Sequence, residues 1–317
     1  MKKLSSNNLL KQNAIWLVFL IEVIIFAIAS GGTFVTGNNI VNIARQVSYY
    51  GIASIGMTFV ILIAGIDLSI GSIITLVNVV CAFLMVNAGM NMWVAVLISV
   101  LLATAIGVLN GAMVASIGIP ALIATFATQT IFEGVSYLIS GGRPIAGFDS
   151  NFGIFGRWSV GPVPICALIM IACFAIGSFI LNKSFFGRYF YAIGGNEEAA
   201  ELSGIRVNRV KYLIYALSGL FAGLAGIVLL SRSGSAQSTV GKGLEFDVIT
   251  CVVLGGVSVN GGVGRMSGVI AGVLIIGSLT NGMILMDVSE YTQMVVKGIV
   301  LAIAVGIDCV SKKRQAV

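Results

Sequence analysis

The fold of this chain is decided by its one long polar interruption, residues 183–211, which reads KSFFGRYFYAIGGNEEAAELSGIRVNRVK. This stretch holds eight of the charged residues in a 317-residue chain that has only 18 Lys and Arg and 12 Asp and Glu. Asn196 can cap a helix there, and Gly204 can supply its left-handed stop. Glu197 and Glu198 would fall in the first turn, where the helix dipole favours negative charge. The predicted helix has about two turns, too few to cross a bilayer.

The rest of the chain is too apolar for an ordinary soluble domain. Hydrophobic residues make up 58% of it and charged residues 9%, where soluble domains have about 25% charged residues. The mean hydropathy is +1.05. Many of the 40 glycines lie inside apolar runs, where small residues let helices approach closely in lipid. We therefore predict an all-α, multi-pass membrane protein with a single transmembrane domain over residues 1–317.

Apolar runs of suitable length predict about ten transmembrane helices. An even number of spans before and after residues 183–211 places this loop and both termini in the cytoplasm. Lys2, Lys3 and Arg314 at the two ends agree with that topology, because cytoplasmic segments carry excess Lys and Arg. Residues 141–162 then form the largest external loop, with turns expected rather than a folded domain. The predicted spans are 14–32, 47–65, 68–87, 92–112, 120–140, 163–182, 212–231, 246–258, 266–285 and 293–310.

The composition argues against an enzyme. Histidine is absent, which removes the commonest metal ligand and proton shuttle. No cluster of nucleophile, acid, base or metal ligands occurs, and no Gly-x4-Gly-Lys-Ser/Thr phosphate loop is present, so no cofactor is expected and ATP hydrolysis would need another chain. The net charge of +6 is explained by cytoplasmic Lys and Arg rather than by a nucleic-acid partner. The five cysteines lie in or beside apolar runs and are expected to be small buried hydrophobes.

Two Gly-rich interruptions fall at matching places in the two halves and suggest a weak internal repeat. Asp67, in the first interruption, is the most unusual polar residue of the apolar runs, because a carboxylate at membrane depth costs on the order of 3 kcal/mol. It could cap the helix that begins near Ser69 or pack against another subunit, and the alternative is a direct role in a gate. The predicted gate or helix-break residues are Gly65, Asp67, Ser69, Gly71, Gly255, Gly256, Asn260 and Gly261.

Neutral polar side chains inside the apolar runs are candidates for lining a pathway for an uncharged polar solute, since hydroxyl groups need donors and acceptors but no charge. The alternative for each is hydrogen bonding between helices, the commoner role of such residues. The principal candidates are Asn78, Asn110, Thr125, Gln129 and Asn281, with Thr128, Thr280 and Gln237 beside them.

Four stretches resemble a known family: GIDLSIGS (65–72), YAIGGNEEAAELSGI (191–205), YALSGLFAGLAGI (215–227) and VLGGVSVNGGVGR (253–265). They look like the membrane permeases of bacterial ABC importers for monosaccharides. The resemblance runs over nearly the whole chain, and the 191–205 stretch is highly specific to that group. It implies a vitamin-B12-importer-like fold in the cytoplasmic (inner) membrane, a second permease subunit expected to be an identical copy, sugar-type ATPase subunits and an extracytoplasmic sugar-binding protein.

By that resemblance, the short polar helix would be the coupling helix that docks on the ATPase. The residue types suit docking, because three small or apolar side chains could contact a partner while three glutamates pair with basic residues around them. The alternative is a solvated loop that has no docking role and whose charges only set the topology. The expected coupling residues are Asn196, Glu197, Glu198, Ala199, Ala200, Glu201, Leu202 and Gly204.

The sequence therefore predicts the permease subunit of an ATP-driven sugar importer, with ribose as the first expected substrate. Other pentoses and hexoses and the signalling molecule autoinducer-2 are the alternative substrates that the resemblance implies. An ion-coupled secondary sugar transporter is the competing class. It would be indicated by paired intramembrane carboxylates and by uptake without any ATPase.

Overall fold

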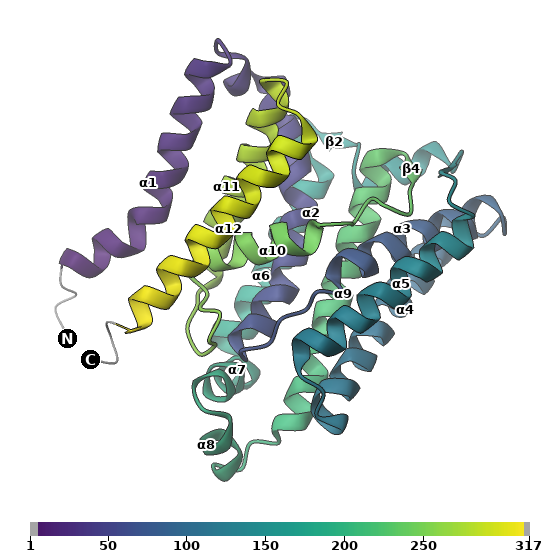
Figure 1. Cartoon of the computed structure of the whole chain (residues 1–317). Coiled ribbons are helices and arrows are strands. Elements are labelled where there is room, and N and C mark those ends of the chain that lie inside the picture. Colours follow the sequence, from purple (N-terminus) through teal and green to yellow (C-terminus); the bar gives the residue numbers. More distant parts are fainter. Residues whose placement is uncertain (1–5, 314–317) are drawn as a thin grey trace.

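The computed structural model describes the backbone of residues 6–313 and the side chains of residues 15–310. Lys2, Lys3 and Arg314, which entered the predicted topology, lie outside these described residues. Helices account for most of the described chain (Figure 1). They are α1 (Ser6–Ala29), α2 (Gly37–Leu62), α3 (Ile70–Val86), α4 (Met92–Ala112), α5 (Ala121–Ser140), α6 (Ile165–Lys183), α7 (Phe185–Gly195), α8 (Glu197–Leu202), α9 (Val207–Ser233), α10 (Leu244–Leu254), α11 (Met266–Leu285) and α12 (Glu290–Lys313).

Each of the ten predicted spans overlaps one of these helices, and α7 and α8 are the two that do not belong to a span. Within the described residues, six helical segments are long and apolar enough to cross a membrane by length and composition. By contrast α10 has 11 residues and α3 has 17. The chain is a multi-pass membrane protein, and the number ten stays a prediction. The six segments are Met92–Ile117, Ala121–Ser140, Ile165–Lys183, Val207–Ser233, Met266–Leu285 and Glu290–Val310.

The centre of the molecule is α9, which packs against α2, α3 and α4. Its glycines explain how close the packing is. A Cβ added at Gly219 would overlap the backbone of Ala103 in α4, and a Cβ at Gly107 in α4 would overlap the backbone of Tyr215 in α9. Backbones that approach this closely gain dispersion contacts that lipid cannot replace. The helix ends at Gly234, a left-handed residue with φ of 72°, as helices commonly do.

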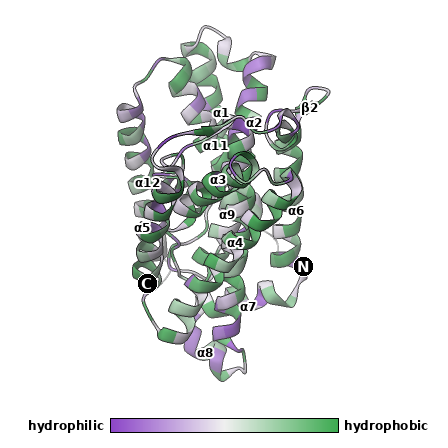
Figure 2. Ribbon diagram, turned by 90° about the vertical axis from the view of Figure 1, so that its right-hand side faces the viewer, coloured by the Kyte–Doolittle hydropathy of each residue, from purple (hydrophilic) through white to green (hydrophobic). Residues whose placement is uncertain are grey.

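The end of the molecule opposite α8 carries the four short strands. β1 (Ile145–Ala146) pairs antiparallel with β4 (Ser235–Ala236), and β2 (Ser159–Val160) pairs with β3 (Val163–Pro164). Between them lies a 3-10 helix, η3 (Ser150–Phe155). Figure 2 shows hydrophobic residues along the middle of the molecule, while hydrophilic residues gather toward its two ends, including α8. This division agrees with a membrane-spanning body between two polar ends.

The remaining short elements are a 3-10 helix, η1 (Thr33–Val35), after α1 and one π-helical turn, η2 (Met113–Ile117), that extends α4. All five cysteines lie in the described part of the chain. Four are buried, and Cys309 near the end of α12 is exposed. The expectation of buried cysteines is therefore right for four and wrong for Cys309, because few neighbours cover that end of α12.

Candidate functional site

The lower end of the molecule in Figure 1 is formed by α7 and α8, which are joined without a loop. The side chain of Ser184 accepts a hydrogen bond from the Gly187 amide at the start of α7. The side chain of Asn196 accepts one from the Ala199 amide, 2.9 Å away, at the start of α8. Gly204 follows α8 with φ of 85°. The cap, the acidic first turn and the left-handed stop predicted from the sequence are all present.

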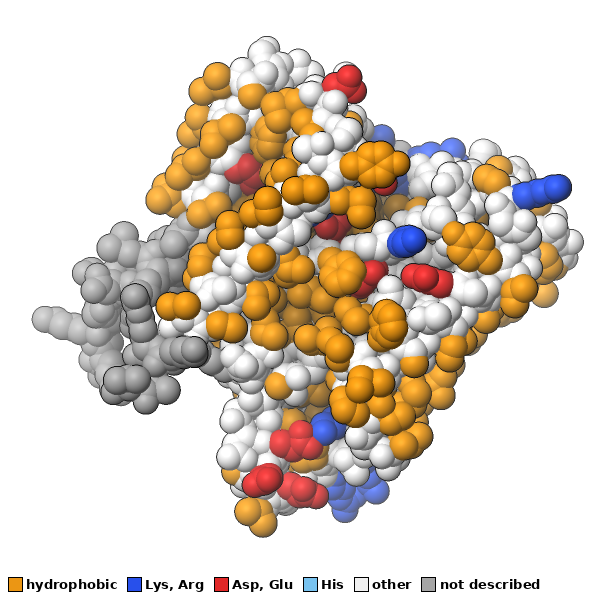
Figure 3. Space-filling model, viewed as in Figure 1, with side chains coloured by type: hydrophobic (Ala, Val, Ile, Leu, Met, Phe, Trp, Pro, Cys, Tyr) orange, Lys and Arg blue, Asp and Glu red, His pale blue; other side chains and the backbone are white. Residues whose placement is uncertain are grey.

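The outer surface of α8 is unusual because it combines charge with an exposed apolar side chain. Leu202 is 90% exposed, and Glu198 and Glu201 are exposed beside it. Figure 3 shows acidic and basic side chains grouped at this end of the molecule. An exposed leucine beside acidic residues suits contact with a partner surface that has an apolar pocket and basic residues.

Two predicted coupling residues are engaged within the chain itself. Ala200 was expected on the docking surface, but it is 4% exposed and packs into the core beside α9. That expectation is wrong, because the short helix needs one apolar side chain to hold it against the body. Glu197 forms an ion pair with Lys211 in α9, with 2.6 Å between Oε1 and Nζ. Glu197 therefore fixes α8 on α9, and Glu198 and Glu201 keep their carboxylates at the surface.

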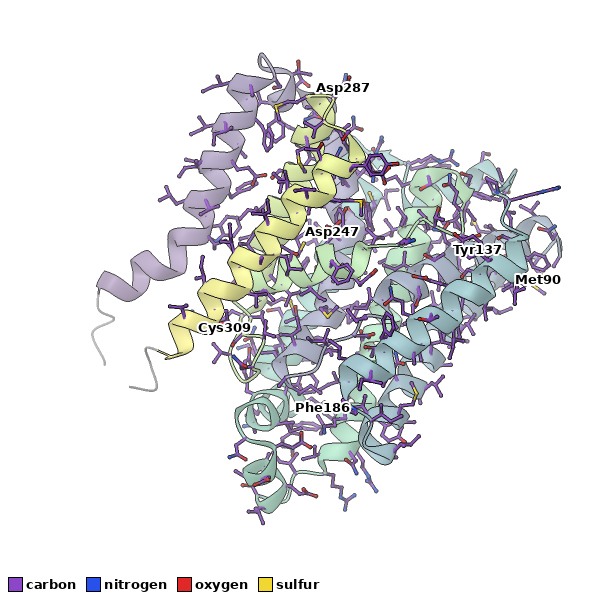
Figure 4. The ribbon with its side chains drawn as sticks, in the orientation of Figure 1. Met90, Tyr137, Phe186, Asp247, Asp287 and Cys309 are labelled. Carbon is purple, nitrogen blue, oxygen red and sulfur yellow. The ribbon has the colours of Figure 1, made fainter. Side chains whose placement is uncertain are left out.

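The sequence analysis missed α7 as a separate helix. Phe190 and Ile193 on one of its faces are buried, and Phe185 and Phe186 are exposed (Figure 4 labels Phe186). This amphipathic pattern could have revealed it, since apolar residues at helical spacing mark a packed face. The sequence analysis treats residues 183–211 as one polar loop that holds a single short helix.

At the first break, the carboxylate of Asp67 is fully buried and holds three hydrogen bonds. Its Oδ1 accepts from the Ser69 amide at 3.0 Å and from the Ser69 hydroxyl, and its Oδ2 accepts from the Ser218 hydroxyl of α9 at 2.7 Å. The network continues through the Asn110 amide, which donates to the Ser69 hydroxyl. Asp67 thus orders the turn before α3 and ties it to α9. These bonds resemble the capping role that the sequence analysis considered, although Ser69 is itself the N-cap residue, and packing against another subunit stays a prediction.

The second break is the loop of residues 255–265 between α10 and α11. Gly256 and Gly261 have φ of 83° and 78°, and Asn260 is exposed. The loop lies against the end of α2, where the Gly262 amide donates to the Leu62 carbonyl at 2.9 Å. The two predicted breaks are therefore neighbours in space, although nearly 200 residues separate them in the chain.

The predicted pathway residues divide into two groups. Asn110 and Thr125 belong to the network around Asp67, Asn78 donates to the Gly226 carbonyl, and Asn281 accepts from Asn39. These are buried contacts between helices, which is the alternative that the sequence analysis left open for them. The second group has one member, Gln129, which is half-buried on α5 and is not enclosed between helices as the other four are.

Around Gln129 lies a polar face that the sequence analysis did not identify. The Gln129 amide nitrogen donates to Glu245 Oε1 at 3.0 Å and to Glu133 Oε1 at 3.4 Å. Close by, Lys297 on α12 pairs with Asp247 at 2.8 Å, where Figure 4 labels Asp247. Figure 3 shows charged side chains of both signs together on the face between α12 and α5.

Glu245 and Asp247 were missed because they fall in and beside the run predicted as the span 246–258. A signal for them was nevertheless present. They lie in the first turn of α10, directly after the left-handed Gly243. An acidic first turn after a glycine marks the start of a helix rather than its middle.

Comparison with known proteins places the chain among transport permeases. Residues 39–305 match the family described as branched-chain amino acid transport system / permease component. The chain belongs to this permease family. This result confirms the resemblance that the sequence showed, and members of the family are transport components rather than enzymes. It does not favour an ion-coupled secondary transporter.

Several curated relatives share much of the permease sequence. A ribose import permease of Bacillus subtilis is 43% identical over 309 residues, covering 97% of this chain and 95% of the relative. One of Escherichia coli K12 is 43% identical over 296 residues, covering 92% of each. An L-arabinose transport system permease of the same organism is 39% identical, covering 89% of this chain and 86% of the relative. No solved structure matches the chain.

Proposed function

We propose that this chain is the transmembrane permease subunit of an ATP-driven importer that moves a monosaccharide, with ribose as the substrate, across the bacterial cytoplasmic membrane. The similarity to ribose import permeases over nearly the full length supports the sugar. The observation that carries the mechanism is the exposed Leu202 and acidic surface of α8 at one pole of a membrane-spanning body.

In this proposal α8 is the coupling helix and residues 183–211 face the cytoplasm. Leu202 enters an apolar pocket of a sugar-type ATPase subunit, and Glu198 and Glu201 meet basic residues at its rim. ATP binding closes the ATPase pair and moves α8, and the permease switches access from outside to inside. A sugar-binding protein delivers the substrate at the opposite end, where residues 141–162 lie. The fold proposed is that of vitamin-B12-type importers, with both termini in the cytoplasm.

The polar face around Gln129 is the proposed sugar pathway. Polar side chains in apolar spans face water or protein rather than lipid, because exposure to hydrocarbon is costly. On this face α5 and α12 bury little of their length, so a second copy of the chain would enclose it. The Gln129 carbonyl oxygen and the Glu133 carboxylate then offer acceptors to sugar hydroxyls, since the Gln129 amide nitrogen already donates to Glu133 and Glu245.

ATP-dependent uptake in reconstituted vesicles tests this function. The complex contains this chain, its ATPase and a ribose-loaded binding protein, and wild type is compared with the double variant Glu198→Lys, Leu202→Asp. The double variant is expected to lose the ATPase subunit and stimulated hydrolysis, because it reverses a charge and places a carboxylate in an apolar pocket. The matched control is Asn182→Asp, an exposed position near the end of α6. Uptake by wild type without any ATPase, driven by an ion gradient, would overturn the proposal.

A further inference from the structure

The last helix, α12, packs Val300, Ala304 and Val305 against the core and is joined to the body by two polar attachments as well. Only 6% of its apolar segment is buried, against 72% for α9. Near its first turns, the Lys297 ammonium pairs with Asp247 of α10. Near its last turns, Asp308 Oδ2 accepts from the Ser258 hydroxyl at 3.0 Å and from the Val259 amide at 3.1 Å. The second attachment holds α12 to the loop of residues 255–265.

That loop is in turn held to α7 through backbone contact. A Cβ added at Gly194 would overlap the Leu62 carbonyl and lie 2.5 Å from the Gly262 amide nitrogen. The Tyr191 hydroxyl of α7 donates to the Gly264 carbonyl at 2.9 Å. Burial raises the pKa of Tyr191, so its hydroxyl keeps the proton that it donates. Because the two backbones touch at Gly194 and the Tyr191 hydroxyl binds the loop, movement of α7 is expected to displace the loop.

The connection from α7 to α8 is equally direct. Gly195 ends α7, and the next residue, Asn196, caps α8. One continuous set of contacts therefore runs from the exposed surface of α8, through α7 and the loop, to the far end of α12. Figure 4 shows Cys309, next to Asp308, toward the same end of the molecule as Phe186 in α7.

We propose that Asp308 is a positioning residue for transport, which transmits movement of α8 to α12 through the loop of residues 255–265. The inference rests on the proposed function, because it needs α8 to be moved by an ATPase. Its consequence is specific. When the Asp308 bonds are removed, α8 still binds and moves with the ATPase, but α12 follows less closely, so less sugar is moved for each ATP hydrolysed.

The bonds themselves suggest a decisive pair of variants. Both donors to Asp308 are neutral groups, a hydroxyl and an amide, so the amide oxygen of asparagine can accept the same bonds. Alanine can accept neither. Asp308→Asn is therefore expected to keep the connection, and Asp308→Ala is expected to lose it. Glu290→Ala, an exposed acidic position at the start of the same helix, is the matched control for loss of a carboxylate.

The measurement is ribose taken up per ATP hydrolysed, by the full complex in vesicles with loaded binding protein. Asp308→Ala is expected to lower this ratio about fivefold, the scale of losing one or two hydrogen bonds. Its stimulated ATP hydrolysis should stay within about twofold of wild type. Asp308→Asn and Glu290→Ala should keep the wild-type ratio. If asparagine keeps the ratio and alanine lowers it, Asp308 acts by accepting hydrogen bonds and its charge is not needed.

Three outcomes would overturn the inference: a wild-type ratio for Asp308→Ala, an asparagine variant as impaired as alanine, or a Glu290→Ala variant impaired equally. Should Asp308→Ala fail to accumulate in membranes, the double variant Ser258→Ala, Tyr191→Phe decides, because it removes one hydroxyl on each side of the loop. If this double variant keeps the wild-type ratio of ribose to ATP, the proposed connection from α7 through the loop to α12 is wrong. Failure of the proposed function looks different, since the wild-type complex would then show no sugar-stimulated ATP hydrolysis at all.

Discussion

The helices α9 and α12 are both long and apolar, yet they are held in opposite ways. Most of α9 is buried and meets its neighbours through glycines, so its position is fixed by backbone contact with α4. Little of α12 is buried, and the Lys297 and Asp308 bonds add to the few apolar contacts that hold it, such as that of Ala304 with the core. Close packing resists displacement in every direction, whereas a few hydrogen bonds can be exchanged for others. The difference indicates a rigid centre with an outer helix that can move.

Gly219→Leu should have the largest effect on stability, because it disrupts the close packing between α9 and α4. The new side chain would overlap the backbone of Ala103, which cannot move aside as a side chain could. Overpacking of this kind is expected to cost more than about 3 kcal/mol. The variant should accumulate poorly in membranes and lose its thermal transition in detergent.

The control is Gly306→Leu on α12, where nothing lies within 4 Å of an added Cβ. It should leave accumulation and the melting temperature unchanged. Equal damage from the two leucines would remove the distinction between the two helices.

Lys297→Met should have an intermediate effect, because it leaves the Asp247 carboxylate with a hydrogen bond from the Tyr50 hydroxyl, at 3.1 Å, but without its cationic partner. The two side chains are only 18% and 11% exposed, so the unpaired charge should cost about 2–3 kcal/mol. Thermal unfolding of the purified protein measures the loss.

The double variant Lys297→Met, Asp247→Asn should recover most of that stability, since no buried charge remains. Recovery would show that Lys297 stabilises the protein mainly by neutralising the buried Asp247 carboxylate. If the double variant is as unstable as the single one, packing around Lys297 holds the helix instead.

Lys211→Ala should have the smallest effect. It removes the ion pair with Glu197, whose side chain is 48% exposed, and exposed pairs contribute about 0.2–1 kcal/mol. The melting temperature should change little, and the difference from wild type should shrink further in high salt. A loss as large as that of Lys297→Met would mean that α8 is held far more firmly than its exposure suggests.

Features that depend on near neighbours in sequence were predictable. The cap at Asn196, the acidic first turn and the stop at Gly204 are set within a few residues, and all were predicted. The glycines of 215–227 were correctly expected at close helix contacts, since in lipid such residues mark helix interfaces.

Features that depend on distant partners were not predictable in the same way. Burial of Ala200 against the body and the bond from Asn110 to Ser69 are decided by how the helices assemble. The ion pair of Lys297 with Asp247 joins residues 50 positions apart in the chain. The acidic start of α10 is different, because its local signal was present but lay at the edge of an apolar run that was counted as a span.

The thiol of Cys309 gives the molecule a natural probe. It is the one exposed cysteine of five, it lies in α12, and it follows Asp308 directly. A membrane-impermeant maleimide applied to one face of oriented vesicles would label it only if the end of α12 opens to that face. The rate at which the maleimide labels Cys309 during turnover would show whether the end of α12 changes its exposure. This measurement uses the native sequence, with no cysteine added or removed.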